Sequence, residues 1–136
     1  MSAKDFLKKM MYIDYMIDCK IEQVTELRGR LTSIGSTVGG ERVQSSKSND
    51  KFADTIGKIV ELEKNINADI DKLIDYKSKA REMIELLDSD IEKIILYKRY
   101  FDKKSFEQIA TECHYSWRWI HKLHSSALQN LNKVMK

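Results

Sequence analysis

Two runs of apolar residues at alternating steps of four and three constrain this chain more than any other feature of its sequence. The first run extends from about Ala3 to Leu31, interrupted only by Lys20, and the second extends from Phe52 to Leu87. Spacing of this kind places the apolar side chains on one stripe of an α-helix, as in a coiled coil. Such a stripe must be buried against another element, so the two runs predict a pair of long packed helices.

The composition favours an all-α fold for the whole chain. The 136 residues include no Pro and only 5 Gly, and 33% of them are charged and 42% hydrophobic. These proportions are typical of long helices rather than of sheet or disorder. Residues 33–50, between the two runs, are rich in Ser and Gly, which predicts a loop. We therefore predict an antiparallel helical hairpin, a coiled coil, over residues 1–88 with its loop at 33–50.

The polar residues within the two stripes predict the register of this hairpin. Facing positions of antiparallel helices have residue numbers with a constant sum, and a sum of 83 places Lys20 opposite Glu63. A slip of one heptad would leave each charge against an apolar layer, at a cost of several kcal/mol for each unpaired charge. We therefore predict that the Lys20–Glu63 pair fixes the register.

The second predicted helix has more apolar surface than one partner helix can cover. Val60, Leu62 and Ile74 flank its stripe, and Met16 and Ile21 flank the stripe of the first helix. Surface of this kind must be covered, either by the C-terminal segment folding back or by a second copy of the hairpin. We predict the second copy, and hence a homodimer.

Basic residues concentrate in the predicted C-terminal domain, residues 89–136. Residues 1–88 contain 15 Lys or Arg and 16 Asp or Glu, whereas residues 89–136 contain 9 and 5, with no acidic residue after Glu112. A basic terminal domain suits a polyanionic partner such as double-stranded DNA. Solvated lysines on an ordinary helix are the alternative explanation.

The spacing of residues from Ser105 to Leu131 is typical of a helix-turn-helix. Ser105 and Gln108 can form a capping box, Ala110 is small enough for a close helix crossing, and Ser116 can cap the next helix. One face of that helix carries apolar residues at steps of three and four: Ile120, Leu123, Ala127 and Leu131. We predict that the other face contacts base edges in the major groove, through Trp117, Arg118, His121 and Lys122.

Further residues of this segment are predicted to contact phosphates or to be structural. The predicted phosphate contacts are Lys103, Lys104, Ser105, Ser116 and Ser125. Arg118 is the strongest candidate for base readout, because bidentate donation to guanine is the commonest specific contact. Trp119 is predicted to lie nearer the core, and His124 to reach only the DNA backbone.

These motifs resemble known transcription proteins. The run YKRYFDKKSFEQIATECHYSWRWIHKLHSSALQNL resembles region 4 of bacterial sigma factors, in which an aromatic pair leads into S-x-x-x-I-A, a turn, Ser and a recognition helix closed by A-L-x-x-L. The whole chain, including RVQSS at residues 42–46, is similar to small phage and prophage proteins of Gram-positive bacteria grouped with ArpU-type and RinA-type late transcription regulators. The resemblance implies sequence-specific DNA binding and regulation of phage or prophage late genes, and it permits contact with host RNA polymerase.

One residue departs from the sigma-like pattern. His114 stands where that motif usually has Gly. A left-handed backbone at the turn costs His about 1 kcal/mol more than Gly, although His tolerates this region better than most residues.

Several other classes of function are disfavoured. The sequence shows no paired carboxylates, no Gly-rich phosphate loop and no activated nucleophile, so it predicts neither an enzyme nor a cofactor. Cys19 and Cys113 lack the spacing of a zinc site. The absence of a long apolar run and of a leader predicts a protein of the bacterial cytoplasm that does not enter a membrane. Two other functions stay open, a DNA-recognition subunit for packaging that resembles a small terminase, and a protein-interaction adaptor.

Overall fold

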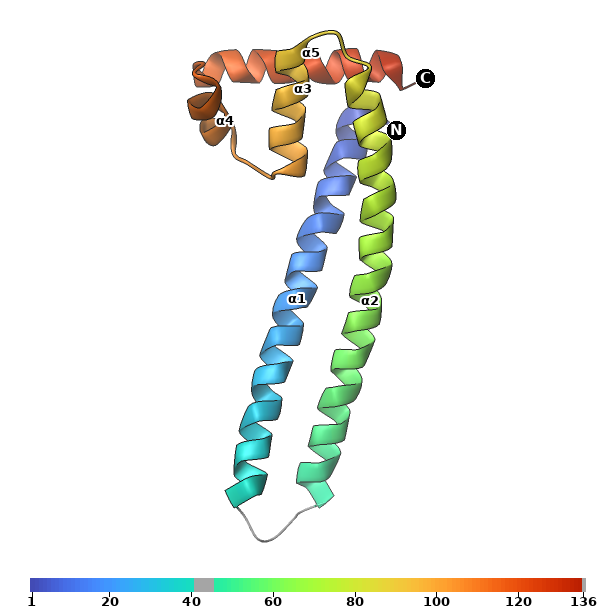
Figure 1. Ribbon diagram of the computed structural model, residues 1–136, viewed down its shortest axis with the longest axis vertical. Helices are drawn as coiled ribbons and strands as arrows, with labels where there is room; N and C mark the ends of the chain where they lie inside the picture. The colour runs from blue at the N-terminus through green and yellow to red at the C-terminus, as the bar shows by residue number, and fades with distance from the viewer. Residues whose placement is uncertain (41–45, 136) are drawn as a thin grey trace. The chain divides into compact units, whose positions relative to one another are not determined.

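The computed structural model describes residues 1–40 and 46–135, with side chains at 1–33 and 49–135. The elements, shown in Figure 1, are α1 (Ala3–Gly40), α2 (Ser46–Glu85), α3 (Asp90–Leu96), the π-helical turn η1 (Tyr97–Phe101), α4 (Phe106–Cys113) and α5 (Trp117–Val134). Because the described residues contain no strand, the predicted all-α fold class is confirmed. None of the described helices is long and apolar enough to cross a lipid bilayer.

The chain forms two compact units. The first, here called the terminal unit, comprises Met1–Asp14 and Lys72–Lys136, and the second, the middle unit, comprises Tyr15–Asp71. The predicted division at residue 88 differs from this one, because the start of α1 and the end of α2 are counted with the C-terminal helices.

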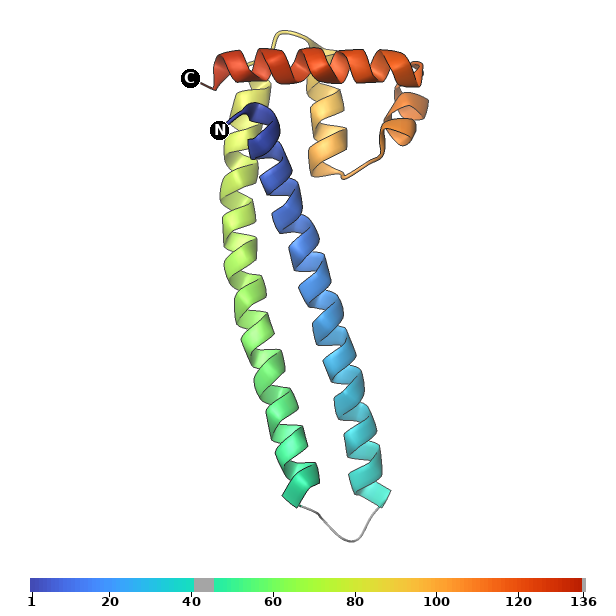
Figure 2. The ribbon, with the colours of Figure 1, turned by 180° about the vertical axis from the view of Figure 1, so that it is seen from behind.

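In the middle unit, α1 and α2 lie side by side and run in opposite directions, as Figures 1 and 2 show. Their facing sides bury apolar residues at heptad spacing, which are Ile17, Val24, Ile59 and Ile66. Burial of four such side chains contributes roughly 1.5–3 kcal/mol each relative to exposure. The heptad pattern is therefore confirmed for these four residues, whereas Phe52, Ile56 and Ile70 of the same stripe are 40%, 40% and 37% exposed, contrary to the prediction.

The predicted register of the two helices is wrong by one heptad. In the middle unit Lys20 Nζ lies 2.5 Å from Asp69 Oδ2, and Arg28 Nη2 lies 3.1 Å from Glu63 Oε1. The residue numbers of these pairs sum to 89 and 91, so the register lies near 90 rather than 83. Lys20 and Glu63 are not partners.

The slipped register leaves no charge stranded, because each long side chain reaches a partner outside its own layer. The ammonium of Lys20 extends to Asp69 beside the stripe, and the carboxylate of Glu63 turns outward to Arg28. Flexible aliphatic stems can place a charge at the rim of a core layer while the stem itself packs in the layer. The cost that the prediction assigned to the slip therefore does not arise, and the apolar layers decide the register.

The predicted loop at 33–50 is also longer than the gap between the helices. α1 continues to Gly40 and α2 begins at Ser46, and residues 41–45 lie outside the described residues. Extending an existing helix by one residue costs far less than starting one, so the low helix propensity of Ser and Gly does not end α1 where the composition predicts.

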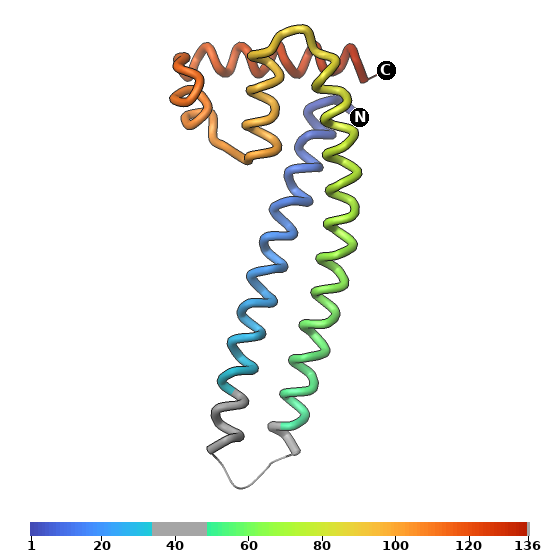
Figure 3. Tube along the Cα trace, viewed as in Figure 1, coloured from blue at the N-terminus to red at the C-terminus, as the bar shows by residue number. Residues whose placement is uncertain are grey.

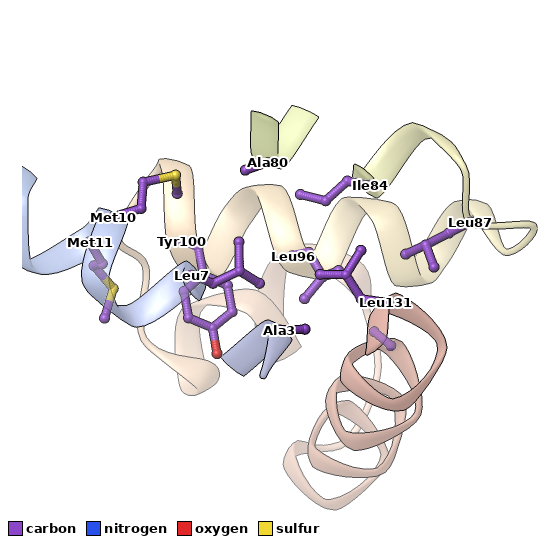
Figure 4. Close-up of a cluster of buried hydrophobic side chains, with 11 residues drawn as sticks. Ala3, Leu7, Met10, Met11, Ala80, Ile84, Leu87, Leu96, Tyr100 and Leu131 are labelled. Carbon is purple, nitrogen blue, oxygen red and sulfur yellow. The ribbon is translucent and has the colours of Figure 1, made fainter. Parts of the chain in front are cut away.

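The core of the terminal unit joins segments from both ends of the chain. Figure 4 shows this cluster, which comprises Ala3, Leu7, Met10, Met11, Ala80, Ile84, Leu87, Leu96, Tyr100, Ala127 and Leu131. The first turn of α1 is also tied to the end of α5, because the backbone N–H of Ala3 donates to Asn132 Oδ1 at 2.7 Å. The C-terminal helices therefore share one core with the start of α1 and the end of α2.

Ser89 separates α2 from the helices that follow, as the sequence predicts. Its side chain accepts a hydrogen bond from the backbone N–H of Glu92 and caps α3. The path of the chain from α2 through α3 and η1 into α4 can be followed in Figure 3. Within α3, Ile95 and Leu96 are fully buried, whereas Ile94 is 42% exposed.

Candidate nucleic-acid interface

The connection between α4 and α5 is built by the caps that the sequence predicts. Ser105 Oγ accepts from the backbone N–H of Gln108 at 3.2 Å, and Gln108 Oε1 accepts from the backbone N–H of Ser105 at 3.0 Å. Ser116 caps α5 by accepting from the backbone N–H of Trp119 at 3.1 Å. The capping box and the second N-cap are therefore confirmed.

His114 ends α4 in the left-handed conformation that the motif normally gives to Gly. Its backbone angles are φ 58° and ψ 38°, and its N–H donates to the carbonyls of Ala110 and Thr111. The N–H of Tyr115 also donates to Ala110, at 3.0 Å, so the last carbonyls of α4 are satisfied by the turn. His114 adopts the left-handed conformation despite the cost of a side chain at this position.

A small core fixes α4 against α5 beneath this turn. Ile109 and Ile120 are fully buried, and Ala110 is 8% exposed. Ile95 of α3 completes this core, and Cys113 packs against its edge. A methyl group at Ala110 lets the two helices approach closely. The orientation of α5 relative to α4 is thus set by apolar packing.

The side of α5 that faces away from this core carries polar and basic side chains. Arg118, Lys122 and Ser125 are exposed and line a shallow groove with Gln129. Steps of four, three and four place these residues on one face of the helix. A cationic surface at the start of a helix, opposite its buried face, can enter a groove of a duplex and donate to bases or phosphates.

His121 is only partly exposed, although the sequence analysis groups it with the exposed Arg118. Its ring centroid lies 4.3 Å from that of Phe106 and 4.0 Å from that of Trp117, and its Nε2 atom is buried without a hydrogen-bond partner among the described residues. The guanidinium of Arg99 lies 4.3 Å from the centroid of Phe106. His121 therefore packs between Phe106 and Trp117, with ring planes inclined at 41° and 53°, while Trp117 itself remains 53% exposed.

The predicted burial of Trp119 and the predicted exposure of His124 are both wrong. Trp119, predicted to lie nearer the core, is 45% exposed because it lies a quarter turn away from Ile120 on the rim of α5. His124, predicted to reach the DNA backbone, is only 8% exposed. Both assignments are corrected, and Trp119 joins the exposed aromatic residues at the start of α5.

His124 forms a buried polar contact with η1. Its Nε2 atom lies 2.9 Å from the hydroxyl oxygen of Tyr100, and the two rings are stacked with centroids 5.8 Å apart. Burial, assisted by the positive charge of Arg99, lowers the pKa of His124 from 6.5 to about 4. His124 is therefore neutral at pH 7, and its Nε2 atom can accept a hydrogen bond from the hydroxyl of Tyr100. The same burial raises the pKa of Tyr100, which keeps its hydroxyl protonated.

A second buried polar contact, which the sequence analysis missed, ties α3 to α5. The carboxylate of Glu92, a residue that is buried, accepts from Ser126 Oγ at 2.8 Å and from Asn130 Nδ2 at 2.9 Å. Hydrogen bonds to a charged acceptor are stronger and more directional than neutral ones. These two hydrogen bonds therefore help to fix the position of α5 on α3.

Four of the five residues predicted to contact phosphate, all except the exposed Ser125, already have partners within the protein. Lys103 Nζ lies 3.2 Å from Asp14 Oδ1, and Lys104 Nζ lies 2.8 Å from Glu112 Oε1. The N–H of Ser105 is used in the capping box. Lys98, which the sequence analysis did not single out, also pairs with Glu112, at 2.5 Å.

Hydrogen bonds from these two lysines stabilise the ionised carboxylate of Glu112. The hydrogen bond from Lys104, followed by that from Lys98, lowers the pKa of Glu112, and the same contact raises the pKa of Lys98. Both shifts favour the charged forms of Glu112 and Lys98. The spacing along the sequence gave no signal of this triad, because its members come from η1, the following turn and the end of α4.

Comparison of the chain with protein-family models, with curated proteins and with solved structures gives no match. Among the described residues, no group of three His, Cys, Asp or Glu side chains is placed to hold a metal ion.

Proposed function

We propose that this protein is a sequence-specific DNA-binding regulator of transcription that inserts the start of α5 into the major groove of a duplex. The observation that carries the proposal is the exposed face of Arg118, Lys122 and Ser125 on a helix that is capped at Ser116 and packed on its opposite face. This arrangement presents donors to base edges while the turn and α4 approach the DNA backbone. Arg118 reads a guanine, and Lys122 and Ser125 contact neighbouring bases or phosphates.

The exposed aromatic residues at the start of α5 extend this surface. Trp117 is held by His121, and Trp119 lies on the other rim of the helix. Indole rings in these places can pack on thymine methyl groups or on sugars, which adds apolar contact to a basic surface. The resemblance to sigma factor region 4 and to small phage proteins extends the proposal to phage or prophage late genes, with host RNA polymerase as a possible partner.

The proposal includes a homodimer formed through the middle unit. Phe52, Ile56 and Val60 are each at least 40% exposed and follow one another at steps of four along one face of α2. Met16 and Ile21 of α1 are also exposed. A second copy that packs on these faces would form a four-helix core, and two DNA-binding surfaces on one dimer gain affinity by binding together.

Selection of bound fragments from genomic DNA, together with the mass of the protein in solution, tests the proposal. A regulator selects promoter-proximal fragments that share an inverted repeat, and it sediments as a dimer. Arg118→Ala selects fragments with relaxed preference at one base pair in each half-site. Lys133→Ala, which removes an exposed basic side chain from the last turn of α5, serves as the matched control. Recovery of random fragments by the wild-type protein would contradict sequence-specific binding.

A packaging subunit is the second candidate function. A helix-turn-helix joined to an oligomerising helical pair also suits the small subunit of a terminase. The exposed apolar faces of the middle unit are what favours an assembly of either kind. A ring of roughly eight or more chains in solution would favour packaging over regulation. An adaptor would show no steep dependence of DNA binding on salt.

A further inference from the structure

Two lysines, one in η1 and one in the turn before α4, converge on one carboxylate at the end of α4. Lys98 Nζ lies 2.5 Å from Glu112 Oε1, and Lys104 Nζ lies 2.8 Å and 2.9 Å from the two oxygens of the same carboxylate. The side chains of all three residues are partly exposed, between 27% and 35%. The triad therefore lies at the surface, where a ligand in solution can compete for the lysines.

The backbone holds the two lysines in this arrangement. The N–H of Lys104 donates to the carbonyl of Lys98 at 3.0 Å, and Arg99 Nη1 donates to the carbonyl of Lys104 at 3.0 Å. Lys103 turns the chain between them in the left-handed conformation, with φ 57°. The main chain thus holds the backbones of Lys98 and Lys104 side by side without any contribution from Glu112.

The anion that the two ammonium groups surround has the chemistry of a phosphodiester. A carboxylate and a phosphodiester each carry one negative charge shared by two oxygens that accept hydrogen bonds. Lysine donates to either group, because its ammonium is a compact point charge with three rotatable N–H donors. Two cations beside one carboxylate also leave a surplus positive charge, which attracts a further anion.

We propose that Lys98 and Lys104 form a binding site for a backbone phosphodiester of DNA, and that Glu112 occupies this site in the free protein. The inference rests on the proposed function, and it assigns a regulatory contact to the same surface. A duplex that docks on α5 brings its backbone beside α4, and one phosphate replaces the carboxylate. Glu112 thereby weakens binding to every sequence by the same factor, so that binding without base contacts is suppressed.

The test compares Glu112→Gln with a matched variant, Glu107→Gln. Glu107 is exposed on the same helix and forms no ion pair among the described residues. Both variants remove one negative charge, but only the first releases the lysines. Binding is measured by fluorescence anisotropy with a labelled duplex of random sequence, and thermal melting checks that each variant remains folded. We expect Glu112→Gln to bind at least about threefold more tightly than Glu107→Gln, because releasing the lysines adds about one phosphate contact.

A double-mutant cycle separates release of the lysines from a general change of charge. Lys104→Gln is made in the wild-type protein and in the Glu112→Gln variant. We expect Lys104→Gln to reduce affinity at least about threefold more in the variant, because only there is the lysine free of its carboxylate partner. Lys98→Gln should behave in the same way.

The outcomes distinguish this inference from the proposed function. If the wild-type protein binds the duplex, equal affinities of the two glutamate variants, or equal losses from Lys104→Gln in both backgrounds, would overturn the phosphate site alone. If neither the wild-type protein nor Glu112→Gln binds any duplex at low ionic strength, the proposed function and the inference are both overturned.

Discussion

The buried contact between His124 and Tyr100 predicts that the protein loses stability in mild acid. Burial lowers the pKa of His124 from 6.5 to about 4, so the unfolded chain takes up a proton on this side chain below pH 6.5 while the folded chain remains neutral. The stabilising effect is fully present above about pH 6.5, and it is lost as the pH falls toward 4. At pH 7 the contact is intact.

The size of the loss follows from the difference between the two pKa values. Each pKa unit corresponds to about 1.4 kcal/mol, and at pH 5 the unfolded chain is protonated at His124 whereas the folded chain is largely not. Between pH 7 and pH 5 the linkage amounts to about 2 kcal/mol, and residual hydration of the ring reduces it to between about 1 and 2 kcal/mol.

Urea denaturation at pH 7, 6 and 5, followed by circular dichroism, measures this loss. His124→Gln removes the titrating group while leaving an acceptor for the Tyr100 hydroxyl. Between pH 7 and pH 5 the variant should therefore lose less stability than the wild-type protein, by a difference of about 1 kcal/mol or more. Gln129→Ala, at an exposed position without an ionisable group, should keep the full dependence of the wild-type protein. An equal loss in His124→Gln and in the wild-type protein would refute the reasoning.

Three further predictions concern the packing. Glu92→Ala leaves two donors of α5 without an acceptor and should reduce the free energy of unfolding by about 2–4 kcal/mol in urea denaturation, a result that a loss below about 0.5 kcal/mol would contradict. A double-mutant cycle for Lys20 and Asp69 should give a coupling of about 0.5 kcal/mol, whereas the cycle for Lys20 and Glu63 should give none. A fragment of residues 89–136 should show little helical circular dichroism, because it lacks the part of its core that α1 and α2 supply; a cooperative melt of the fragment would contradict this.

The local features of the candidate interface could be predicted because neighbouring residues determine them. Ser105, Gln108 and Ser116 satisfy the free N–H groups at helix starts three residues away, so their roles follow from spacing alone. The same holds for Ala110, whose small side chain is required where two helices cross closely. These predictions are confirmed without knowledge of any distant contact.

The features that were predicted wrongly depend on the reach of side chains or on contacts between distant segments. The register of α1 and α2 fails as a prediction because the stem of Lys20 carries its charge to Asp69, beside its own layer. On α5, steps of three and of four from Ile120 both remain near the buried face, so spacing alone does not separate Leu123 from His124. Burial of His124 is set by Tyr100, which no local pattern connects with it.

The measurement that tests the central claim most directly is the affinity of the purified protein for its selected site and for a scrambled duplex over a series of salt concentrations, beside Arg118→Ala. The account predicts that both proteins lose affinity steeply with salt, and with similar slopes. It also predicts that Arg118→Ala loses about 1–3 kcal/mol of the wild-type preference for the selected site. Absence of binding to either duplex at low ionic strength, or an undiminished preference in Arg118→Ala, would contradict the claim that the start of α5 reads DNA.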